Sequence, residues 1–196
     1  MVGKTGVGKS ASGNTILGKE HFESKCSPDS LTVTCAKAFG EVDGQRVAVI
    51  DTPGLSDSRF DAEETRGRIN QSIAYASPGP HVFLVVIRLG RFKDEEIQSV
   101  QKIQEIFGEE ADRYSMVLFT YGDLLKGTPI EEFWKESGDL QELVGKCNGQ
   151  YHVFNNKVED RSQVRELLDK IRNITEKNGG SHYTNEMFQK VERFIE

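Results

Sequence analysis

Three short stretches of this sequence carry residue types suited to binding a nucleoside phosphate, and the first lies near its start. Residues 3–10 read GKTGVGKS and fit the phosphate-loop pattern G-x-x-x-x-G-K-S/T. Glycines at both ends let successive backbone N–H groups point at phosphate oxygens, and the helix that follows adds the positive end of its dipole. Lys9 can reach the outer phosphates, and the Ser10 hydroxyl can bind Mg²⁺. A flexible glycine turn is the alternative explanation. The candidate nucleotide-binding residues here are Gly3, Lys4, Thr5, Gly6, Val7, Gly8, Lys9, Ser10 and Ala11.

The second stretch, Asp51-Thr52-Pro53-Gly54, directly follows an apolar run. Asp51 would hold Mg²⁺ through water, and the Gly54 N–H would meet a terminal phosphate. A strand-ending turn is the alternative, because Asp, Pro and Gly are all good turn residues. Since ligands of open α/β sheets bind at the carboxyl ends of strands, the position of the stretch favours the metal-binding interpretation.

The third stretch, Thr120-Tyr121-Gly122-Asp123, follows the apolar run 114–119. Guanine offers two N–H donors on one edge, and the Asp123 carboxylate can accept both. GTP-binding proteins commonly have N/T-K-x-D here, and Tyr121 stands in the lysine position, where its ring could stack on the base. A helix N-cap is the alternative role for a T-x-x-D pattern. Asn155 and Asn156, after another apolar run, either contact the base or form a turn.

Apolar runs that suit strands alternate with segments whose apolar residues recur at helical spacing. This order predicts an α/β fold with a mainly parallel sheet covered on both faces. Asp43-Gly44 between two strand candidates predicts a hairpin, and therefore one antiparallel edge strand. The expected strands are 31–39, 46–51, 81–89, 114–120 and 151–155. The expected helices are 9–18, 62–76, 94–107, 130–144 and 164–174. A nucleotide-binding domain is expected over 1–178, and a C-terminal helical extension over 179–196.

Composition narrows the class of protein. A chain of 196 residues suits one domain with a short appendage. Its formal net charge of −6 argues against a nucleic-acid partner, which requires a concentrated basic face. The three cysteines lack C-x-x-C spacing, which indicates reduced thiols and a cytoplasmic location. No apolar run reaches the length of a membrane span.

With these motifs assembled, the sequence resembles the GIMAP family, the GTPases of immunity-associated proteins. The stretches that carry the resemblance are GKTGVGKSASGNTILG (3–18), SLTVTC (30–35), SPGPHVFLVVIRLGRF (77–92) and GGSHYTNEMFQ (179–189). The resemblance implies a Ras-like P-loop GTPase fold with a six-stranded sheet and Mg²⁺-dependent binding of GTP or GDP. It also implies nucleotide-controlled self-association as a homodimer or oligomer, a habit shared with septins and chloroplast import-receptor GTPases.

The same resemblance implies further expectations. SLTVTC resembles the family's switch segment, which makes Thr32 the expected Mg²⁺-binding threonine, with Thr34 as the alternative. Ser24 is expected to approach the nucleotide, or to be an ordinary loop serine. Family members carry an apolar strand directly before the first loop, where this sequence has only Met1 and Val2, so we expect a truncated first strand and an incomplete C-terminal extension. An intact form could lie at internal membranes.

The residues also bear on hydrolysis. In Ras-type enzymes a glutamine after D-x-x-G orients the attacking water, whereas Leu55 occupies that position here. An apolar side chain cannot polarise water, so we expect slow intrinsic hydrolysis that a second protomer completes. Arg91 is the candidate catalytic residue supplied across a dimer, and a solvated surface arginine is its alternative. The rival functions are a P-loop ATPase or kinase, against which Asp123 argues, and a non-hydrolysing, GTP-dependent scaffold.

Overall fold

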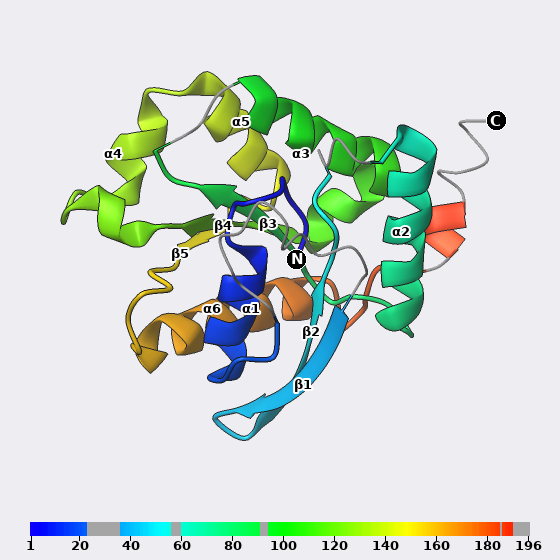
Figure 1. Cartoon of the computed structure of the whole chain (residues 1–196), viewed down its shortest axis with the longest axis horizontal. Helices are drawn as coiled ribbons and strands as arrows, with labels where there is room; N and C mark the ends of the chain where they lie inside the picture. The colour runs from blue at the N-terminus through cyan, green and yellow to red at the C-terminus, as the bar shows by residue number, and fades with distance from the viewer. Residues whose placement is uncertain (23–35, 56–59, 91–93, 185, 190–196) are drawn as a thin grey trace.

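Two apolar runs, FLVVIR and SMVLFT, form neighbouring parallel strands at the centre of the fold (Figure 1). The computed structural model describes residues 1–22, 36–55, 60–90, 94–184 and 186–189. Its strands are β1 (Ala36–Val42), β2 (Gln45–Asp51), β3 (Phe83–Arg88), β4 (Ser115–Thr120) and β5 (Tyr151–Val153). Its helices are α1 (Lys9–Leu17), α2 (Ala62–Tyr75), α3 (Asp94–Phe107), η1 (Glu109–Tyr114), η2 (Gly122–Leu125), α4 (Ile130–Lys135), α5 (Gly138–Lys146) and α6 (Arg161–Lys177).

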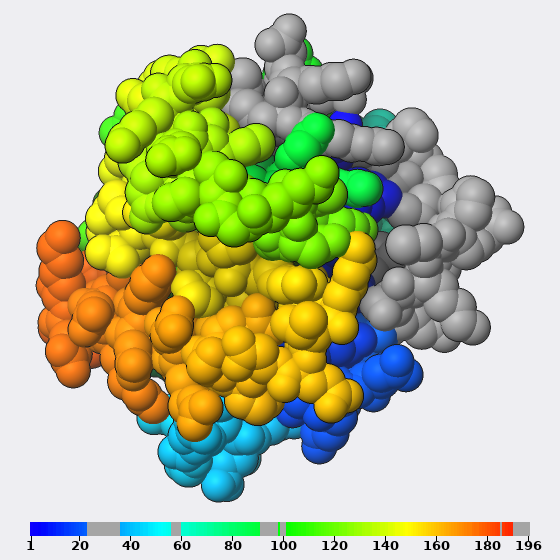
Figure 2. Space-filling view, turned by 90° about the vertical axis from the view of Figure 1, so that its left-hand side faces the viewer, coloured from blue at the N-terminus to red at the C-terminus, as the bar shows by residue number. Residues whose placement is uncertain are grey.

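Strand alternation divides the interior into two cores. Phe83, Val85 and Ile87 of β3 face one core, called the first core below, which α2, α3, α4 and α5 cover. Leu84 and Val86, the residues between them, face the core that α1 and α6 cover. Because β3 and β4 are buried on both faces, they read as continuous apolar runs without polar alternation. Figure 2 shows α6 (orange), the β5 segment (yellow) and α4 with α5 (yellow-green) on one face of the molecule.

The α/β class and the helices on both faces are confirmed, but the six-stranded sheet is wrong for the described residues. They form a three-stranded parallel sheet, β3–β4–β5, and a separate antiparallel hairpin, β1–β2. Met1 and Val2 lie between the two sheets. The Val2 N–H donates to the Leu84 carbonyl and the Val86 N–H to the Val2 carbonyl, both at 2.9 Å, while the Met1 ammonium donates to the Ile50 carbonyl at 2.8 Å. One bridge to β3, between Val2 and Val85, and one terminal hydrogen bond to β2 do not make a ladder that joins the two sheets.

Several element boundaries also differ from the expected ones. The segment 130–144 is not one helix, because α4 ends at Lys135 and a new N-cap follows, in which Ser137 Oγ accepts the Leu140 N–H at 3.3 Å. The strand expected over 81–89 begins at Phe83, and the one expected over 31–39 is described only from Ala36. None of the described helices is long and apolar enough to cross a bilayer.

The segment after α6 packs into the first core. Tyr183 is fully buried, and its hydroxyl donates to the Phe107 carbonyl at 2.7 Å. Its ring makes edge-on contacts with Phe83, Phe107 and Tyr114 at centroid distances between 5.2 and 6.4 Å. The aromatic packing ties residues beyond α6 to β3 and α3, and therefore to the sheet that positions the candidate site.

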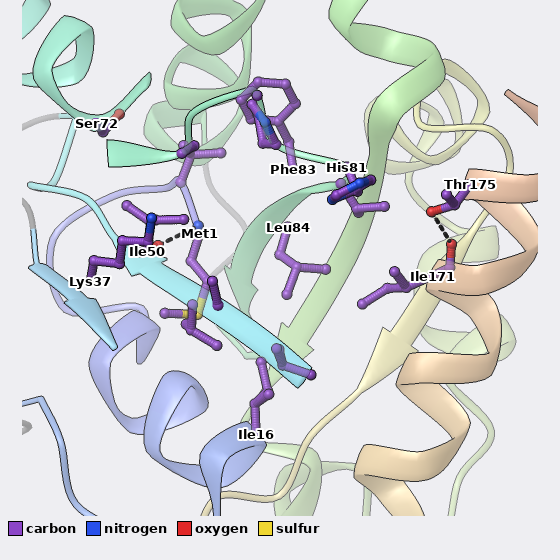
Figure 3. Close-up of a pocket in the computed structure, with 18 of the residues that line it drawn as sticks. Met1, Ile16, Lys37, Ile50, Ser72, His81, Phe83, Leu84, Ile171 and Thr175 are labelled. Atoms are coloured by element: carbon purple, nitrogen blue, oxygen red, sulfur yellow. Dashed lines mark hydrogen bonds between the residues drawn. The ribbon is translucent and has the colours of Figure 1, made fainter. Parts of the chain in front are cut away.

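A cavity of about 620 Å³ lies between β2 and β3, beside Met1 (Figure 3). Apolar side chains from both cores line it, including Ile16, Ile73, Leu84 and Ile171. Side chains and hydrogen-bonding groups alternate along a strand, so the Leu84 N–H points to the same side as the Leu84 carbonyl that holds Val2. The cavity therefore has a strand edge along one side, and its lining is mainly apolar, with polar residues such as Ser72 and Thr175 among it.

We expect an added apolar strand to fill this cavity. Four residues of the Val and Ile type, joined to the Met1 nitrogen, should raise the melting temperature by roughly 5–10 °C, because each buried side chain contributes about 2 kcal/mol before its ordering entropy is subtracted. The measurement is thermal unfolding, compared with a Gly-Ser extension of the same length. Equal melting temperatures for the two extensions would show that the cavity does not accept a strand.

Candidate functional site

The first loop is a backbone cradle closed by a buried lysine. Gly6 and Gly8 have φ values of 81° and 94°, in the left-handed region that favours glycine, and α1 begins directly after them. Lys9 is only 7% exposed, and its ammonium donates to the carbonyls of Gly3 and Lys4 at 3.1 and 2.8 Å. The side chain thus folds back across the loop and fixes its shape at the N-terminus of α1.

Ser10 and Asp51, predicted from separate stretches to bind one metal ion, are in direct contact. Ser10 Oγ donates to Asp51 Oδ2 at 2.5 Å. Asp51 Oδ1 is buried and has no hydrogen-bond partner in the described part of the chain. Burial raises the pKa of Asp51, and the Ser10 hydrogen bond and the Lys9 charge act in the opposite direction.

Oxygen donors of this kind fit Mg²⁺. The ion commonly takes one or two protein oxygens and completes its octahedron with water and phosphate oxygens. No group of three or more His, Cys, Asp or Glu side chains suited to a metal occurs among the residues with described positions. The Ser10–Asp51 pair therefore suits a metal ion that arrives with phosphate, rather than an ion held by protein alone.

The second loop, which begins with the stretch Asp51–Gly54, packs tightly on the first loop, residues 3–10. The Leu55 N–H donates to the Gly3 carbonyl at 3.1 Å. A Cβ atom added to Gly54 would lie 1.9 Å from Thr5 Oγ1 and 2.8 Å from the Thr5 nitrogen, so only glycine allows this approach. Thr5 Oγ1 is itself buried without a partner in the same described region. The two predicted phosphate-binding stretches therefore form one continuous surface.

The third stretch contacts the first loop through the side chain of Thr120. Thr120 is fully buried, and its hydroxyl donates to the carbonyl of Val7, which is also buried, at 2.6 Å. Its side chain also lies next to Gly8, where an added Cβ would be 3.5 Å from Thr120 Cγ2. Thr120 thus holds the loop in place, and Tyr121 and Asp123, the predicted base-contacting residues, follow it at the same end of β4.

One carboxylate oxygen of Asp123 accepts a hydrogen bond, and the other does not. Its Oδ2 accepts a hydrogen bond from Lys157 Nζ at 2.6 Å, while its Oδ1 is buried without a partner among the described side chains. The Lys157 hydrogen bond is the main cause that lowers the pKa of Asp123, so the carboxylate is ionised at neutral pH. Lys157 was not among the predicted site residues, although its position as a basic residue directly after Asn155-Asn156 was a signal for it.

Asn155 and Asn156 both make hydrogen bonds within the protein. Asn156 donates to Ser12 Oγ at 3.1 Å and accepts from Thr15 Oγ1 at 2.8 Å, so it fastens its loop to α1. Asn155 Oδ1 accepts the Lys157 N–H at 3.0 Å, which closes a turn. These contacts agree with the turn alternative.

The remaining candidates have different positions. Ala11 is in the first turn of α1, and Lys4 contributes its carbonyl to Lys9. Ser24, Thr32, Thr34 and Arg91 lie outside the described residues. The structure thus brings the three stretches to one end of the parallel strands and leaves the switch and catalytic assignments as predictions.

Comparison with known proteins supports this picture. The family model described as "AIG1 family" matches residues 1–196. The chain is 35% identical over 189 residues to human "GTPase IMAP family member 8", covering 94% of this chain and 28% of that protein. It is 34% identical over 201 residues to "Immune-associated nucleotide-binding protein 9" of Arabidopsis thaliana, covering 98% of this chain and 59% of that protein. The chain thus spans less than two thirds of each of these relatives.

Solved structures share the fold. Toc33 from Arabidopsis thaliana in complex with GDP and Mg²⁺ superposes with a TM-score of 0.65 at 19% identity, over 88% of this chain and 81% of that chain. The G domain of the T. maritima FeoB iron transporter superposes with a TM-score of 0.58 at 15% identity, over 89% and 95% of the two chains. At these identities the likeness establishes the Ras-like P-loop GTPase fold.

We expect phosphate binding at the first loop to depend on pH through Lys9. Burial lowers the pKa of Lys9 to about 8, although the negative charge of Asp51 acts in the opposite direction. Only the protonated form attracts phosphate, so affinity for GDP should be constant below about pH 7 and fall roughly tenfold per unit above about pH 8. The measurement is a GDP titration across this range without Mg²⁺. Lys9→Arg is the control, because it stays charged while any titration of the nucleotide itself is shared; an identical pH profile for both proteins would contradict the assignment.

Proposed function

The chain belongs to the AIG1 family, as its motifs predicted, and from this premise we propose that it is a guanine-nucleotide-binding domain that holds GDP or GTP together with Mg²⁺. The single observation that carries the proposal is the junction of two phosphate-binding stretches, with Lys9 buried beneath one and Ser10 bonded to Asp51 of the other. A glycine turn without function would have no reason to bury an ammonium and to leave Asp51 Oδ1 without a partner.

Each residue has a role under this proposal. The N–H groups of the first loop and the N-terminus of α1 bind the phosphates, and Lys9 neutralises the outer ones. Ser10 would hold Mg²⁺ directly, Asp51 would hold it through water, and Thr32 is proposed to complete the set. When bound, Mg²⁺ neutralises charge between the outer phosphates. Gly54 presents its N–H to the last phosphate, because its close contact with Thr5 fixes it there.

Asp123 makes guanine the base of choice. Its carboxylate accepts two N–H donors, which guanine presents on one edge and adenine does not. The named relatives point in the same direction, as one is called a GTPase and another a nucleotide-binding protein. A solved structure of the same fold contains GDP and Mg²⁺. A P-loop ATPase would leave the Asp123 carboxylate facing a base edge that cannot satisfy it.

Slow hydrolysis and self-association complete the proposal. Leu55, where a water-positioning glutamine would stand, is 3% exposed and belongs to the first core, so it packs as an apolar anchor. We propose that a second protomer supplies the missing group, with Arg91 as the candidate, and that nucleotide state controls the association. Dimerization is important for the GTPase activity of atToc33 and psToc159, according to a structural study of those proteins. A cytoplasmic location, or one at the surface of internal membranes, is part of the same proposal.

Replacing Asp123 tests the base assignment. Asp123→Asn should weaken GDP binding about 100-fold, because an amide presents only one acceptor and adds a donor against the guanine donors. The same variant should gain affinity for xanthosine diphosphate, whose additional carbonyl accepts the new N–H. Calorimetric titration with GDP, ADP and xanthosine diphosphate measures all three affinities. Asp160→Asn, which removes an equal charge from an exposed N-cap, should leave them unchanged, and equal loss in both variants would count against base recognition by Asp123.

Protein concentration tests the hydrolysis model. Turnover per protein molecule should be slow in dilute solution and should rise with concentration, because two protomers are required. GTP hydrolysis measured over a hundredfold concentration range gives the result directly. Fast turnover that is independent of concentration would contradict the dimer model, and no turnover at any concentration would favour the non-hydrolysing scaffold.

A further inference from the structure

Arg88 and Tyr121 form a stack at the carboxyl ends of the two central strands. Arg88 is the last residue of β3, and its partner in register on β4 is Thr120, directly before Tyr121. The Arg88 Cζ atom lies 4.1 Å from the centroid of the Tyr121 ring, well within the range of a cation–π contact. The guanidinium therefore covers one face of the ring.

Tyr121 is held in an uncommon backbone conformation. Its φ and ψ are 60° and 44°, a left-handed conformation that is rare for a bulky residue and costs free energy. Its neighbours fix it there, because the Thr120 hydroxyl is bonded to the first loop and the Gly122 N–H donates to the Phe154 carbonyl at 2.9 Å. Conformations of this kind persist where the surrounding structure over-determines them, often at binding sites.

Within the described residues, no side-chain hydrogen bond or ion pair accounts for the position of Arg88. Its Nε atom is buried without a hydrogen-bond partner, and no carboxylate forms an ion pair with it in the described portion of the chain. The second face of the Tyr121 ring has no aromatic neighbour among the described residues. The ring contact that the structure describes for Tyr121 is therefore the Arg88 guanidinium, and Tyr121 stands two residues before Asp123.

We propose that Arg88 is a positioning residue, which holds the Tyr121 ring as a stacking platform for the guanine base. The inference rests on the proposed function and adds the recognition of the base face to that of the base edge. Asp123 would accept the N–H donors along the edge, while the ring would cover the face. Arg88 does not touch the nucleotide in this arrangement and acts through Tyr121.

The experiment is a double-mutant cycle with two ligands, GDP and inorganic tripolyphosphate, which has no base. Tyr121→Ala should weaken GDP binding about tenfold, in line with the contribution of aromatic stacking to base binding. Arg88→Gln should weaken it about threefold through the lost cation–π contact, and Arg88→Lys should lie between Arg88→Gln and the unmodified chain. Adding Arg88→Gln to Tyr121→Ala should cause no further loss. Tripolyphosphate affinity should be unchanged throughout.

Controls separate this inference from a structural role and from the proposed function itself. Arg172→Gln removes an arginine on α6 that is paired with Asp169, and it should change neither affinity. Unchanged GDP affinity in Arg88→Gln, an equal loss with tripolyphosphate, or a full additional loss in the Tyr121→Ala background would each overturn the inference. Should Arg88→Gln unfold, Arg88→Lys provides the same comparison. Failure of the unmodified chain to bind GDP would instead contradict the proposed function.

Discussion

The buried ammonium of Lys9 is the interaction on which the candidate site depends. An ammonium removed from water must be compensated, and here the carbonyls of Gly3 and Lys4 accept from it while the Asp51 carboxylate lies near enough to affect its pKa. Meeting this demand forces the first loop to curl around its own lysine. The curl has left-handed glycines, Gly6 and Gly8, at its bends. One buried charge therefore determines the shape of the loop, and the second loop packs against that shape through Gly54 and Leu55.

The parallel strands explain why distant residues meet. The ends of β3 and β4 stand in register, with Arg88 opposite Thr120, so whatever follows the two strands emerges at the same edge. Thr120 then links that edge to the first loop through the Val7 carbonyl, across 113 residues of sequence. The segment proposed to recognise the base is thus hydrogen-bonded to the loop proposed to bind phosphate. A disturbance of the sheet should reach both parts of the site together.

Sequence patterns predicted the parts of the fold that follow local rules. Apolar runs without alternation gave β3 and β4, Asp43-Gly44 gave the hairpin, and the glycine pattern gave the first loop. The six-stranded sheet was wrong because sheet continuity depends on how many residues pair on each side of Val2, which no local pattern encodes. The break between α4 and α5 was missed because Ser137 caps a helix in the middle of a segment with helical spacing. Lys157 and the contacts of Asn156 with α1 depend on partners 34 to 144 residues away, and only the folded chain shows them.

The ion pair between Lys157 and Asp123 prepares the carboxylate of Asp123 for the proposed base contact. A carboxylate that must accept two N–H donors is best kept ionised and correctly oriented before the ligand arrives, and the Lys157 hydrogen bond does both. The Lys157 side chain is 67% exposed, so water screens the pair and its loss costs little. A buried partner would hold Asp123 equally well but would be expensive to displace. An exposed lysine therefore suits a carboxylate that has to exchange one partner for another, and Asp123 Oδ1, buried and without a partner in the described structure, is the acceptor that remains for the second donor.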